Sequence, residues 1–352
     1  MSLRSTFHAR AAVLFLTVVL SAPAAFAAEP GNSYQRRDLD SDGGGIQAER
    51  FDADLVNGWG LAASPSGPWW VNAADSGKSL LYNGNGRKNS LVVSVPGEPT
   101  GIVFNGGTGF MVGTAGAARF LFASEDGTIS AWSPGLAPIT QAVVVVDNSD
   151  SEASYKGLAI DSTTAGTRLY AADFHNAKVD VFDTAFNPVT VAGAFHDPAL
   201  PAGYAPFGIQ MLGGSIYVAY AKQDEDAEEE VVGKGLGIID KYDSSGHLIA
   251  RVATGGALNA PWGMAMAPQS FGRFGGKLLV GNFGNGRINV FDPVTFQPRG
   301  QLKGTDGKPI SIDGLWGIAF GNGGTAGPTG TLYFAAGPDD EERGLFGRID
   351  PE

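Results

Sequence analysis

The sequence predicts an all-β fold, a six-bladed β-propeller, and two observations carry that prediction. Of its 352 residues, 52 are Gly and 20 are Pro, and the stretches between them are short and rich in Val, Ile, Phe and Tyr, which is typical of turn-rich β-proteins. A glycine that follows a bulky or polar residue and precedes an aliphatic one also recurs six times. These motif glycines are Gly60, Gly101, Gly157, Gly208, Gly263 and Gly317. Their spacings of 41, 56, 51, 55 and 54 residues are typical of propeller blades.

Each repeat predicts three or four strands. The run that contains the motif glycine is followed by a second apolar run, such as LYAADF in the third copy and LLVGNF in the fifth. A polar turn comes next, and then a third run that ends in an acid in several copies, as INVFD does. Short runs with β-branched or aromatic residues, bounded by Gly, Asn or Asp, indicate strands. Six such units, stacked face to face, give a propeller.

The motif glycine is predicted to lie in the innermost strand of its blade, where backbones approach closely and a side chain would not fit. Trp59, Trp262 and Trp316 precede three of these glycines, and we expect them to pack between blades rather than to form ligand platforms. The segment 33–42 precedes the first repeat, and the sixth repeat ends almost at the C-terminus. We therefore expect the N-terminal strand to complete the last blade and close the ring.

Residues 1–27 predict a secretory signal peptide. Arg4 and Arg10 precede the apolar run AAVLFLTVVL, and Ala25-Phe26-Ala27 forms a small-residue cleavage site, as in signal peptides. The apolar run is too short to span a bilayer comfortably. We expect a secreted or periplasmic protein with a single propeller domain over residues 28–352 and no membrane insertion after cleavage.

Composition and known motifs exclude several classes of function. The chain has no Cys, so it has no disulfide, thiolate metal site or thiol nucleophile. Its formal net charge of −12 argues against nucleic-acid binding, which needs a basic surface. The sequence contains no P-loop, no G-x-S-x-G, no H-E-x-x-H and no dinucleotide fingerprint.

Three segments resemble a known family: residues 203–210 (GYAPFGIQ), 258–293 and 312–323 (IDGLWGIAFGNG). They are similar to an uncharacterised family of exported bacterial propellers, itself distantly similar to NHL-repeat proteins, in which some members carry a C-terminal PEP-CTERM sorting tail. The resemblance covers essentially the whole mature chain and implies a six-bladed propeller and export, but no activity. No hydrophobic tail follows at the C-terminus here, so membrane sorting is not implied.

Propellers place ligands at a channel mouth, where loops from every blade converge. Two sets of residues are expected there. Those that precede the inner strands are Asn57, Glu98, Lys156, Asn259 and Asp313. Those that follow the second strands are Asn72, Asp75, Asp173, His175, Asn176, Gln223, Asn282, Asn285, Asp339 and Asp340. Oxygen-rich sets suit a hard cation, so one interpretation is a calcium ion held by Asn57, Glu98, Asn259 and Asp313. The alternative is that Asn and Asp simply form turns.

A second calcium pattern is DLDSDGGGIQAE at residues 38–49, which matches a calcium-binding loop. The matching residues are Asp38, Asp40, Asp42, Gly43 and Glu49. No helix-forming segment flanks the pattern, and Gly45 takes its usual apolar position. We therefore expect a solvated acidic connection instead. The acidic run EDAEEE at residues 225–230 is also predicted to be a solvated loop, although it is denser than the family resemblance leads us to expect.

Three histidines follow the signal peptide. His175, and His196 with Asp197, are candidate catalytic residues, because a His–Asp pair at one mouth would form a general base. The alternative is that both are ordinary surface histidines. His247 lies in the turn DSSGHL and is expected to be inert.

Three functions remain open. The first is an exported binding propeller with a site at the channel mouth for a small molecule or an envelope or extracellular protein, with or without calcium. The second, by analogy of fold, is a calcium-dependent enzyme of lactonase or lyase type. The third is an envelope or extracellular scaffold. Because no recognisable catalytic constellation accompanies the repeat, we expect binding rather than catalysis.

Overall fold

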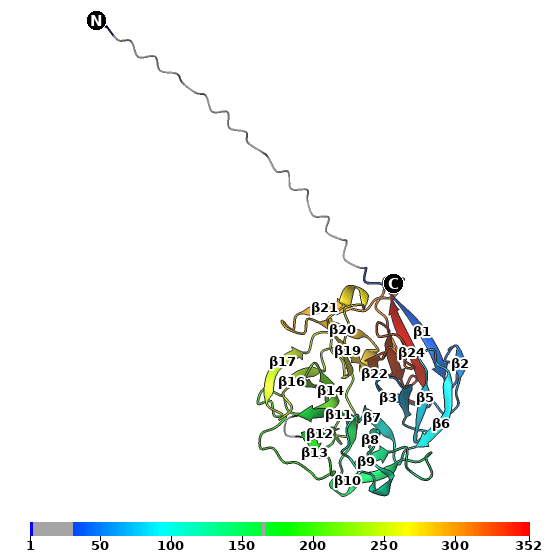
Figure 1. The fold of residues 1–352 in the computed structure, drawn as a ribbon. Coiled ribbons are helices and arrows are strands. Elements are labelled where there is room, and N and C mark those ends of the chain that lie inside the picture. The colour runs from blue at the N-terminus through cyan, green and yellow to red at the C-terminus, as the bar shows by residue number, and fades with distance from the viewer. Residues whose placement is uncertain (3–30, 164–165) are drawn as a thin grey trace. The chain divides into compact units, whose positions relative to one another are not determined.

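Six small sheets, arranged in a ring, make up the computed structural model, which describes residues 1–2, 31–163 and 166–352 (Figure 1). The predicted six-bladed β-propeller is confirmed, and it occupies the compact unit Gly31–Glu352. The predicted signal peptide lies, apart from its first two residues, outside the described residues. Among those described, no helix is long and apolar enough to span a membrane.

In blades 1 to 5, antiparallel strands follow one another from the axis outward in chain order. Blade 1 contains β3 (Gly58–Ala63), β4 (Trp69–Ala73), β5 (Lys78–Tyr82) and β6 (Lys88–Ser94), and blade 2 contains β7 (Pro99–Phe104), β8 (Phe120–Ser124), β9 (Thr128–Trp132) and β10 (Val143–Asp147). Blade 3 contains β11 (Tyr155–Thr163), β12 (Gly166–Asp173) and β13 (Lys178–Phe182). Blade 4 contains β14 (Tyr204–Leu212), β15 (Ser215–Lys222), β16 (Ile238–Tyr242) and β17 (Leu248–Thr254), and blade 5 contains β18 (Pro261–Met266), β19 (Leu278–Asn282), β20 (Ile288–Phe291) and β21 (Pro298–Gln301).

Blade 6 joins the two ends of the propeller. It contains β22 (Leu315–Phe320), β23 (Leu332–Ala336), β24 (Leu345–Pro351), β1 (Tyr34–Ser41) and β2 (Arg50–Phe51). Strand β1 pairs antiparallel with β24 from Tyr34 opposite Pro351 to Ser41 opposite Leu345. The predicted closure by an N-terminal strand is therefore confirmed. Tyr34 anchors the closing strand, because its buried ring packs against Phe271 at 4.8 Å.

The six motif glycines lie in the six inner strands, as predicted. A Cβ atom added to any of them would come within 2.8 Å of a backbone atom of the next blade around the ring. At Gly157, for example, that atom is the carbonyl oxygen of Phe207, and at Gly317 it is the carbonyl oxygen of Trp59. The inner strands therefore pack backbone against backbone, which only glycine permits.

The aromatic residues beside these glycines are buried, but they pack on the axis and not only between neighbouring blades. Trp59 stacks on Trp316 at a centroid distance of 3.7 Å, and Phe207, two blades away from Trp316, lies 5.4 Å from it. With Trp262, Phe174 and Phe283 they form one buried group, which we call the axial cluster. Because the inner strands approach so closely, large side chains at this position meet across the centre.

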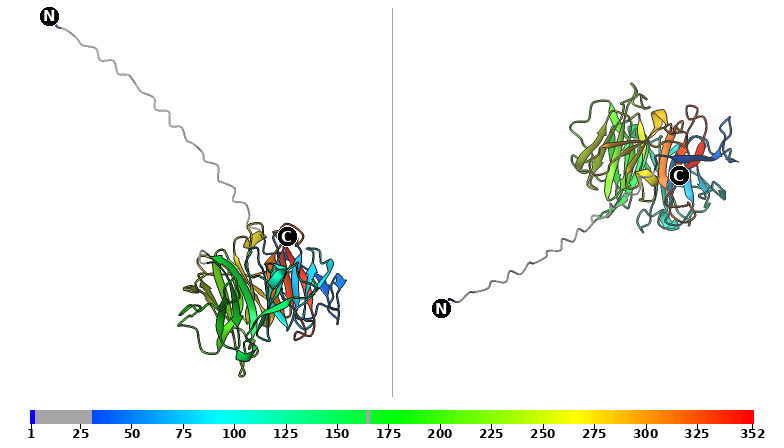
Figure 2. Two further views of the ribbon diagram at one scale, coloured as in Figure 1. Left: turned by 60° about the horizontal axis from the view of Figure 1, so that its bottom comes forward. Right: turned by 90° about the horizontal axis from the view of Figure 1, so that it is seen from above.

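Apolar clusters also fill the space between adjacent blades. Between blades 1 and 2, Trp70 stacks on Phe120 at 4.1 Å and contacts Trp132 at 4.8 Å. Figure 2 shows the blades from two further directions, with their faces stacked around the ring. The core therefore consists of the axial cluster and of further clusters between neighbouring blades.

Candidate functional site

The axial cluster has one polar sector, and it comes from blades 2 and 3. The residue before the motif glycine is aromatic in four blades, but it is Thr100 in blade 2 and Lys156 in blade 3. The residue that follows the second strand of a blade is Phe174 in blade 3 and Phe283 in blade 5, but Glu125 in blade 2. The repeat therefore places a cation and an anion at positions where several of its other copies place aromatic groups.

Lys156 is buried, with a side chain only 1% exposed, and forms an ion pair with Glu125. Its Nζ lies 3.5 Å from a carboxylate oxygen of Glu229 and 5.5 Å from the ring centroid of Trp59. Burial by itself favours the neutral amine, but Glu125 and Glu229 outweigh it and hold the pKa of Lys156 above its ordinary value. The site thus contains a permanently charged ammonium group between an aromatic floor and carboxylates.

Most of the acidic run at residues 225–230 is exposed, as the sequence suggested, but the run also forms the tip of a hairpin that extends β15. The Asp224 amide donates to the Glu229 carbonyl at 2.9 Å, and the Val231 amide donates to the Lys222 carbonyl at 2.7 Å. We call residues 222–231 the mouth hairpin. It carries Glu229 to Lys156, an interaction that a pattern of charges along the sequence does not reveal.

Glu230 of the mouth hairpin faces inward. Its Oε2 atom is buried and has no hydrogen-bond partner among the described residues. Burial raises its pKa to about 8, with Lys156 lowering it and Glu229 raising it. Glu341, which accepts a hydrogen bond from Asn57 at 2.7 Å, has its pKa raised to about 7 by burial. Both carboxyl groups therefore take up protons near neutral pH.

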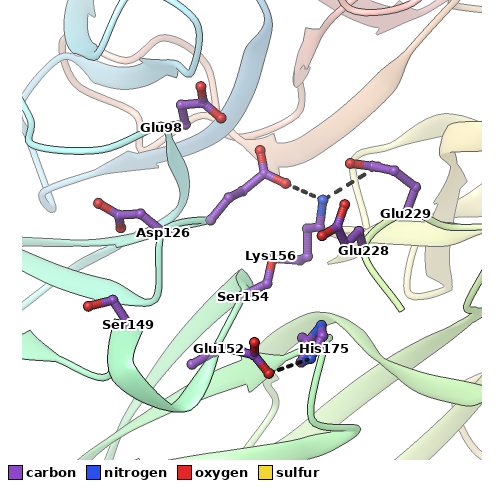
Figure 3. A pocket seen from close by; sticks show the side chains of 11 residues that line it. Glu98, Asp126, Ser149, Glu152, Ser154, Lys156, His175, Glu228 and Glu229 are labelled. Atoms are coloured by element: carbon purple, nitrogen blue, oxygen red, sulfur yellow. Dashed lines mark hydrogen bonds and ion pairs between the residues drawn. The ribbon is translucent and has the colours of Figure 1, made fainter. Parts of the chain in front are cut away.

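A cavity of about 390 Å³ opens beside Lys156 between blades 2, 3 and 4. We call it the mouth cavity. Its lining residues are Glu98, Glu125, Asp126, Ser149, Glu152, Ala153, Ser154, Lys156, His175, Glu228 and Glu229. Figure 3 shows Glu98, Asp126 and Ser149 on one side of Lys156 and the mouth hairpin with Glu228 and Glu229 on the other. Six of the lining residues are acids and Lys156 is the single lysine, so the cavity is strongly anionic.

The charges of the mouth cavity are poorly compensated. Burial, together with neighbouring Glu125 and Asp75, raises the pKa of Glu98. Burial also raises the pKa of Glu229, although Lys156 acts in the opposite direction. A raised carboxyl pKa means that the ionised form lacks sufficient partners. The cavity therefore favours a positive charge that the protein itself does not supply.

Both predicted sets of mouth residues lie at this same end of the propeller. The start of each inner strand pairs with the end of the second strand, as Pro99 does with Ser124 and Tyr155 with Asp173. Residues that precede the one and follow the other thus share a mouth. Of the predicted residues, only Glu98, Lys156 and His175 line the cavity.

Most of the other predicted mouth residues bond to the backbone of turns and neighbouring strands. Asn72 donates to the Thr100 carbonyl at 2.9 Å, and Asn282 donates to the Ala257 carbonyl at 2.8 Å. The carboxylate of Asp173 accepts from the backbone amides of Ser154 and Asn176, both at 3.2 Å.

The remaining predicted mouth residues have the same kind of role or are exposed. Gln223 donates to the Phe174 carbonyl at 2.7 Å, and Asn285 accepts from Asn282 at 3.1 Å. Asp75 is exposed, and Asp339 and Asp340 adopt left-handed backbone conformations with φ of 60° and 51°.

The four predicted calcium ligands are engaged separately. The side chain of Asn57 donates to Glu341, that of Asn259 accepts from the Gly233 amide at 2.6 Å, and that of Asp313 accepts from the Asp339 amide at 3.1 Å. Glu98 lies in the cavity wall. In the part of the chain that the structure describes, no three His, Asp or Glu side chains are grouped so that they could hold a metal ion.

The carboxylates of the 38–49 pattern also point to different partners. Asp38 pairs with Arg36 at 2.7 Å, Glu49 pairs with Arg37 at 2.5 Å, and Asp42 accepts from the Gly344 amide at 2.9 Å. Asp40 is buried in β1, and burial raises its pKa to about 7. The segment lies in the closing strand and in the connection to blade 1.

The structure does not bring the candidate histidines together. His175 lines the mouth cavity, with its Nε2 atom 3.8 Å from Glu152. His196 is exposed and follows Phe195, whose amide donates to the Gly246 carbonyl at 2.7 Å. Gly246 comes after the end of β16 that lies away from the mouth. The carboxylate of Asp197 forms an ion pair with Arg251 of β17, and among the described residues no hydrogen bond or ion pair joins it to either candidate histidine. His247 lies in an exposed turn.

No family model matches this chain. It is 34% identical over 323 residues to the uncharacterized protein L690 of Acanthamoeba polyphaga mimivirus. The alignment covers 86% of this chain and 82% of L690. The chain belongs to the L690 family. Another mimivirus protein of this family, R648, is 34% identical over 322 residues, or 86% of this chain and 77% of its own length. Because these L690-family relatives are viral, bacterial origin and export remain predictions.

Solved structures share the propeller fold with this member of the L690 family. A glucose dehydrogenase superposes with a TM-score of 0.57 at 14% identity, over 89% of this chain and 99% of the other. The virginiamycin B lyase of Staphylococcus aureus superposes with a TM-score of 0.51 at 12% identity, over 90% and 99%. At such low identity the likeness shows the fold alone.

Proposed function

We propose that this propeller is a binding protein that takes a small amine-bearing cation in the mouth cavity. The observation that carries the proposal is the charge of the cavity wall: six acids line it, and its single lysine, Lys156, is buried and already paired with Glu125. A volume of about 390 Å³ suits a small molecule.

The electrostatics favour an ammonium group over a neutral or anionic ligand. Glu98 and Asp126 lie on the side of the cavity away from the mouth hairpin, and Glu152 lies beside His175 (Figure 3). Burial first, and repulsion by Glu125 and Asp75 second, raise the pKa of Glu98, and a cation placed among these acids would offset both effects. Lys156 repels a second cation from the axial floor, which leaves the outer part of the cavity as the binding position.

Isothermal titration calorimetry tests this proposal. The probe is 1,5-diaminopentane at pH 8, with pentane-1,5-diol and glutarate as neutral and anionic controls. We expect saturable binding of the diamine alone, and a loss of about tenfold in affinity in Glu98→Gln and in Asp126→Asn. Asp306→Asn removes the same charge from an exposed turn and should leave the affinity unchanged. Equal binding of diamine and diol would contradict the proposal.

We also propose that the protein is exported, either secreted or retained in a periplasm, and that it meets its ligand outside the cytoplasm. The support is the order of basic residues, apolar run and small-residue cleavage site within residues 1–27. Mass spectrometry of the purified protein should find Ala28 at the N-terminus after expression in a host with a secretory pathway. An intact N-terminal segment in the secreted or periplasmic fraction would contradict this.

The pairing of His175 with Glu152 in the same cavity favours a second candidate function, an enzyme in which His175 acts as a general base. A calcium ion that polarises the substrate belongs to this proposal. Assays on lactones and esters with added calcium test it, with His175→Gln as the variant and the exposed His247→Gln as its control. Turnover that His175→Gln abolishes would support this candidate, and inactivity over the panel would exclude it for these substrates.

A further inference from the structure

Among the residues that the structure describes, blade 3 has only three strands, whereas every other blade has a fourth. It consists of β11, β12 and β13, while the other sheets have four strands, or five in blade 6. In each of the other blades, a fourth strand pairs antiparallel with the third, as β17 does with β16 and β10 with β9. The outer edge of β13 is therefore the position where the propeller repeat is incomplete.

The segment that follows β13 starts to form this strand and then leaves it. The Asp183 amide donates to the Asn187 carbonyl at 2.9 Å, and the Val189 amide donates to the Val181 carbonyl at 2.7 Å. Pro188 has no amide to donate, and the chain turns away where the Ala194 amide bonds to the Val191 carbonyl at 3.1 Å. Only the far end of β13 is covered in this way.

The mouth-proximal half of β13 has free backbone groups on its outer edge. Because Val181 and Asp183 bond outward, the alternation of a strand directs the amide and carbonyl of Val179 outward too. Neither group has a backbone partner among the residues that the structure describes. An exposed pair of this kind is a template for another strand.

A groove of about 330 Å³ runs along this open edge. Its walls are residues 178–182 of β13 on one side and residues 188–191 with Ala194 on the other, while Asn148 and Ser151 close it toward blade 2. Val179 and Val189 are half-buried against the core between blades 3 and 4. Asp180 instead accepts a hydrogen bond from Tyr155 of β11 at 2.8 Å, and Tyr155 packs in the core between blades 2 and 3.

We propose that the edge of β13 binds an extended segment of a partner protein, which adds to blade 3 as its antiparallel fourth strand. The partner's side chain opposite Val179 faces the apolar core and is small or β-branched, while its neighbours in sequence face Asp180 and solvent and are polar. Blade 6 shows that this fold accepts a non-local outer strand, because β1 completes it from the other end of the chain. This surface is independent of the mouth cavity.

Fluorescence anisotropy of a labelled peptide tests the proposal. The probe has the sequence LIARVAT of residues 248–254, which forms the fourth strand of blade 4. Two further peptides carry N-methyl groups on alternate amides, one on each edge of the strand. We expect saturable binding of the unmodified peptide, a loss of at least about tenfold from one N-methylation pattern and a change within about twofold from the other. No saturable binding up to millimolar protein, or equal loss from both patterns, would overturn the proposal.

Two variants locate the binding edge. Val179→Pro removes the outward amide, so we expect binding to be lost. The hydrogen bonds to β12 are made by the alternate residues Lys178, Asp180 and Phe182, so the sheet itself should remain paired. Val179→Ala keeps the amide and should bind within about threefold of the parent protein. Binding that survives in a folded Val179→Pro variant would place the peptide on another edge and overturn the proposal. If that variant does not fold, the N-methylated peptides decide on the unaltered protein.

Discussion

The residue that distinguishes this propeller at the smallest scale is Lys156. It takes a position that is aromatic in four of the six repeats, and its Nζ is buried among Glu125, Glu229 and the ring of Trp59. In a buried ion pair each charge compensates the other, and removal of one partner leaves the other charge buried without compensation. Lys156 therefore couples blades 2, 3 and 4 at the mouth.

Replacing Lys156 tests this coupling. In Lys156→Met, the carboxylates around it lose their buried cation, and we expect about 3–5 kcal/mol of destabilisation at pH 8. The loss should be smaller at pH 5, where Glu230 and Glu341, with pKa values of about 8 and 7, are protonated. Urea denaturation at the two pH values measures both effects.

Two further variants serve as controls for Lys156→Met. The double variant Lys156→Met, Glu125→Gln removes both partners of the ion pair and should recover part of the stability. Lys308→Met removes a lysine whose side chain is 82% exposed and whose partner, Asp306, is also exposed, and it should cost less than about 1 kcal/mol. A cost of that small size in Lys156→Met would contradict the coupling.

Glu230 should make stability depend on pH. Its folded-state pKa of about 8 exceeds the ordinary value of 4.5, so the folded protein holds a proton that the unfolded chain releases between these values. Its contribution is complete below about pH 4.5 and is lost as the pH rises through 8. Glu230→Gln mimics the protonated form, so we expect the Tm at pH 9 to rise by roughly 2 °C or more, with little change at pH 5.

The same thermal scans with Glu225→Gln provide the control for Glu230. Glu225 is an exposed residue of the same hairpin, and its replacement should change the Tm equally at both pH values. A Glu230→Gln variant that loses stability at pH 9 would show that the ionised carboxylate is the favoured form.

At the scale of single elements, the inner strand is the part of the fold that a sequence pattern describes best. A glycine beside an aromatic residue recurs because the backbone of one blade lies against the next. That requirement is local and repeats in every copy, so it can be read from the chain. The mouth hairpin is the opposite case, because the direction of Glu229 depends on a lysine 73 residues earlier in the chain. A run of acids has the same pattern whether or not it meets such a partner.

That the described part of blade 3 has only three strands can be predicted in part from the sequence. Pro188 stands where a fourth strand would continue, and two more prolines, Pro198 and Pro201, follow before blade 4. These residues are visible in the sequence and oppose strand pairing. What they do not show is that the outer edge of β13 stays open, because that depends on where the connection runs in space.

The close approach of inner strands gives a prediction at this scale. Gly208→Ala places a methyl group against the Trp262 carbonyl of the next blade, and we expect a loss of at least about 2 kcal/mol, since neither backbone can move without opening the ring. Gly106→Ala is the control, because its Cβ would approach no heavy atom of its surroundings more closely than 3.4 Å. Equal stability of the two variants in urea would contradict the role of the motif glycine.

At the scale of the whole molecule, a nearly regular ring carries an irregular distribution of charge. The repeat predicts the number of blades, the closing strand and the mouth at which loops meet, because these follow from strand spacing and alternation. It does not predict that the charged groups gather over blades 2, 3 and 4. That sector depends on Lys156 and Glu125, which interrupt the aromatic positions, and on the mouth hairpin. Aligning the six repeats shows that Lys156 replaces an aromatic residue. This replacement is the sequence signal that best indicates the mouth cavity.

The central claim is that the mouth cavity binds an amine-bearing cation, and thermal unfolding of the protein tests it most directly. Unfolding is followed at pH 8 after EDTA treatment, with 1,5-diaminopentane, pentane-1,5-diol or calcium chloride added at equal concentration. A ligand that binds only the folded state raises the Tm by mass action. We predict a rise of roughly 3 °C or more with the diamine and none with the diol. A rise with calcium alone, or none with any of the three, would contradict the claim.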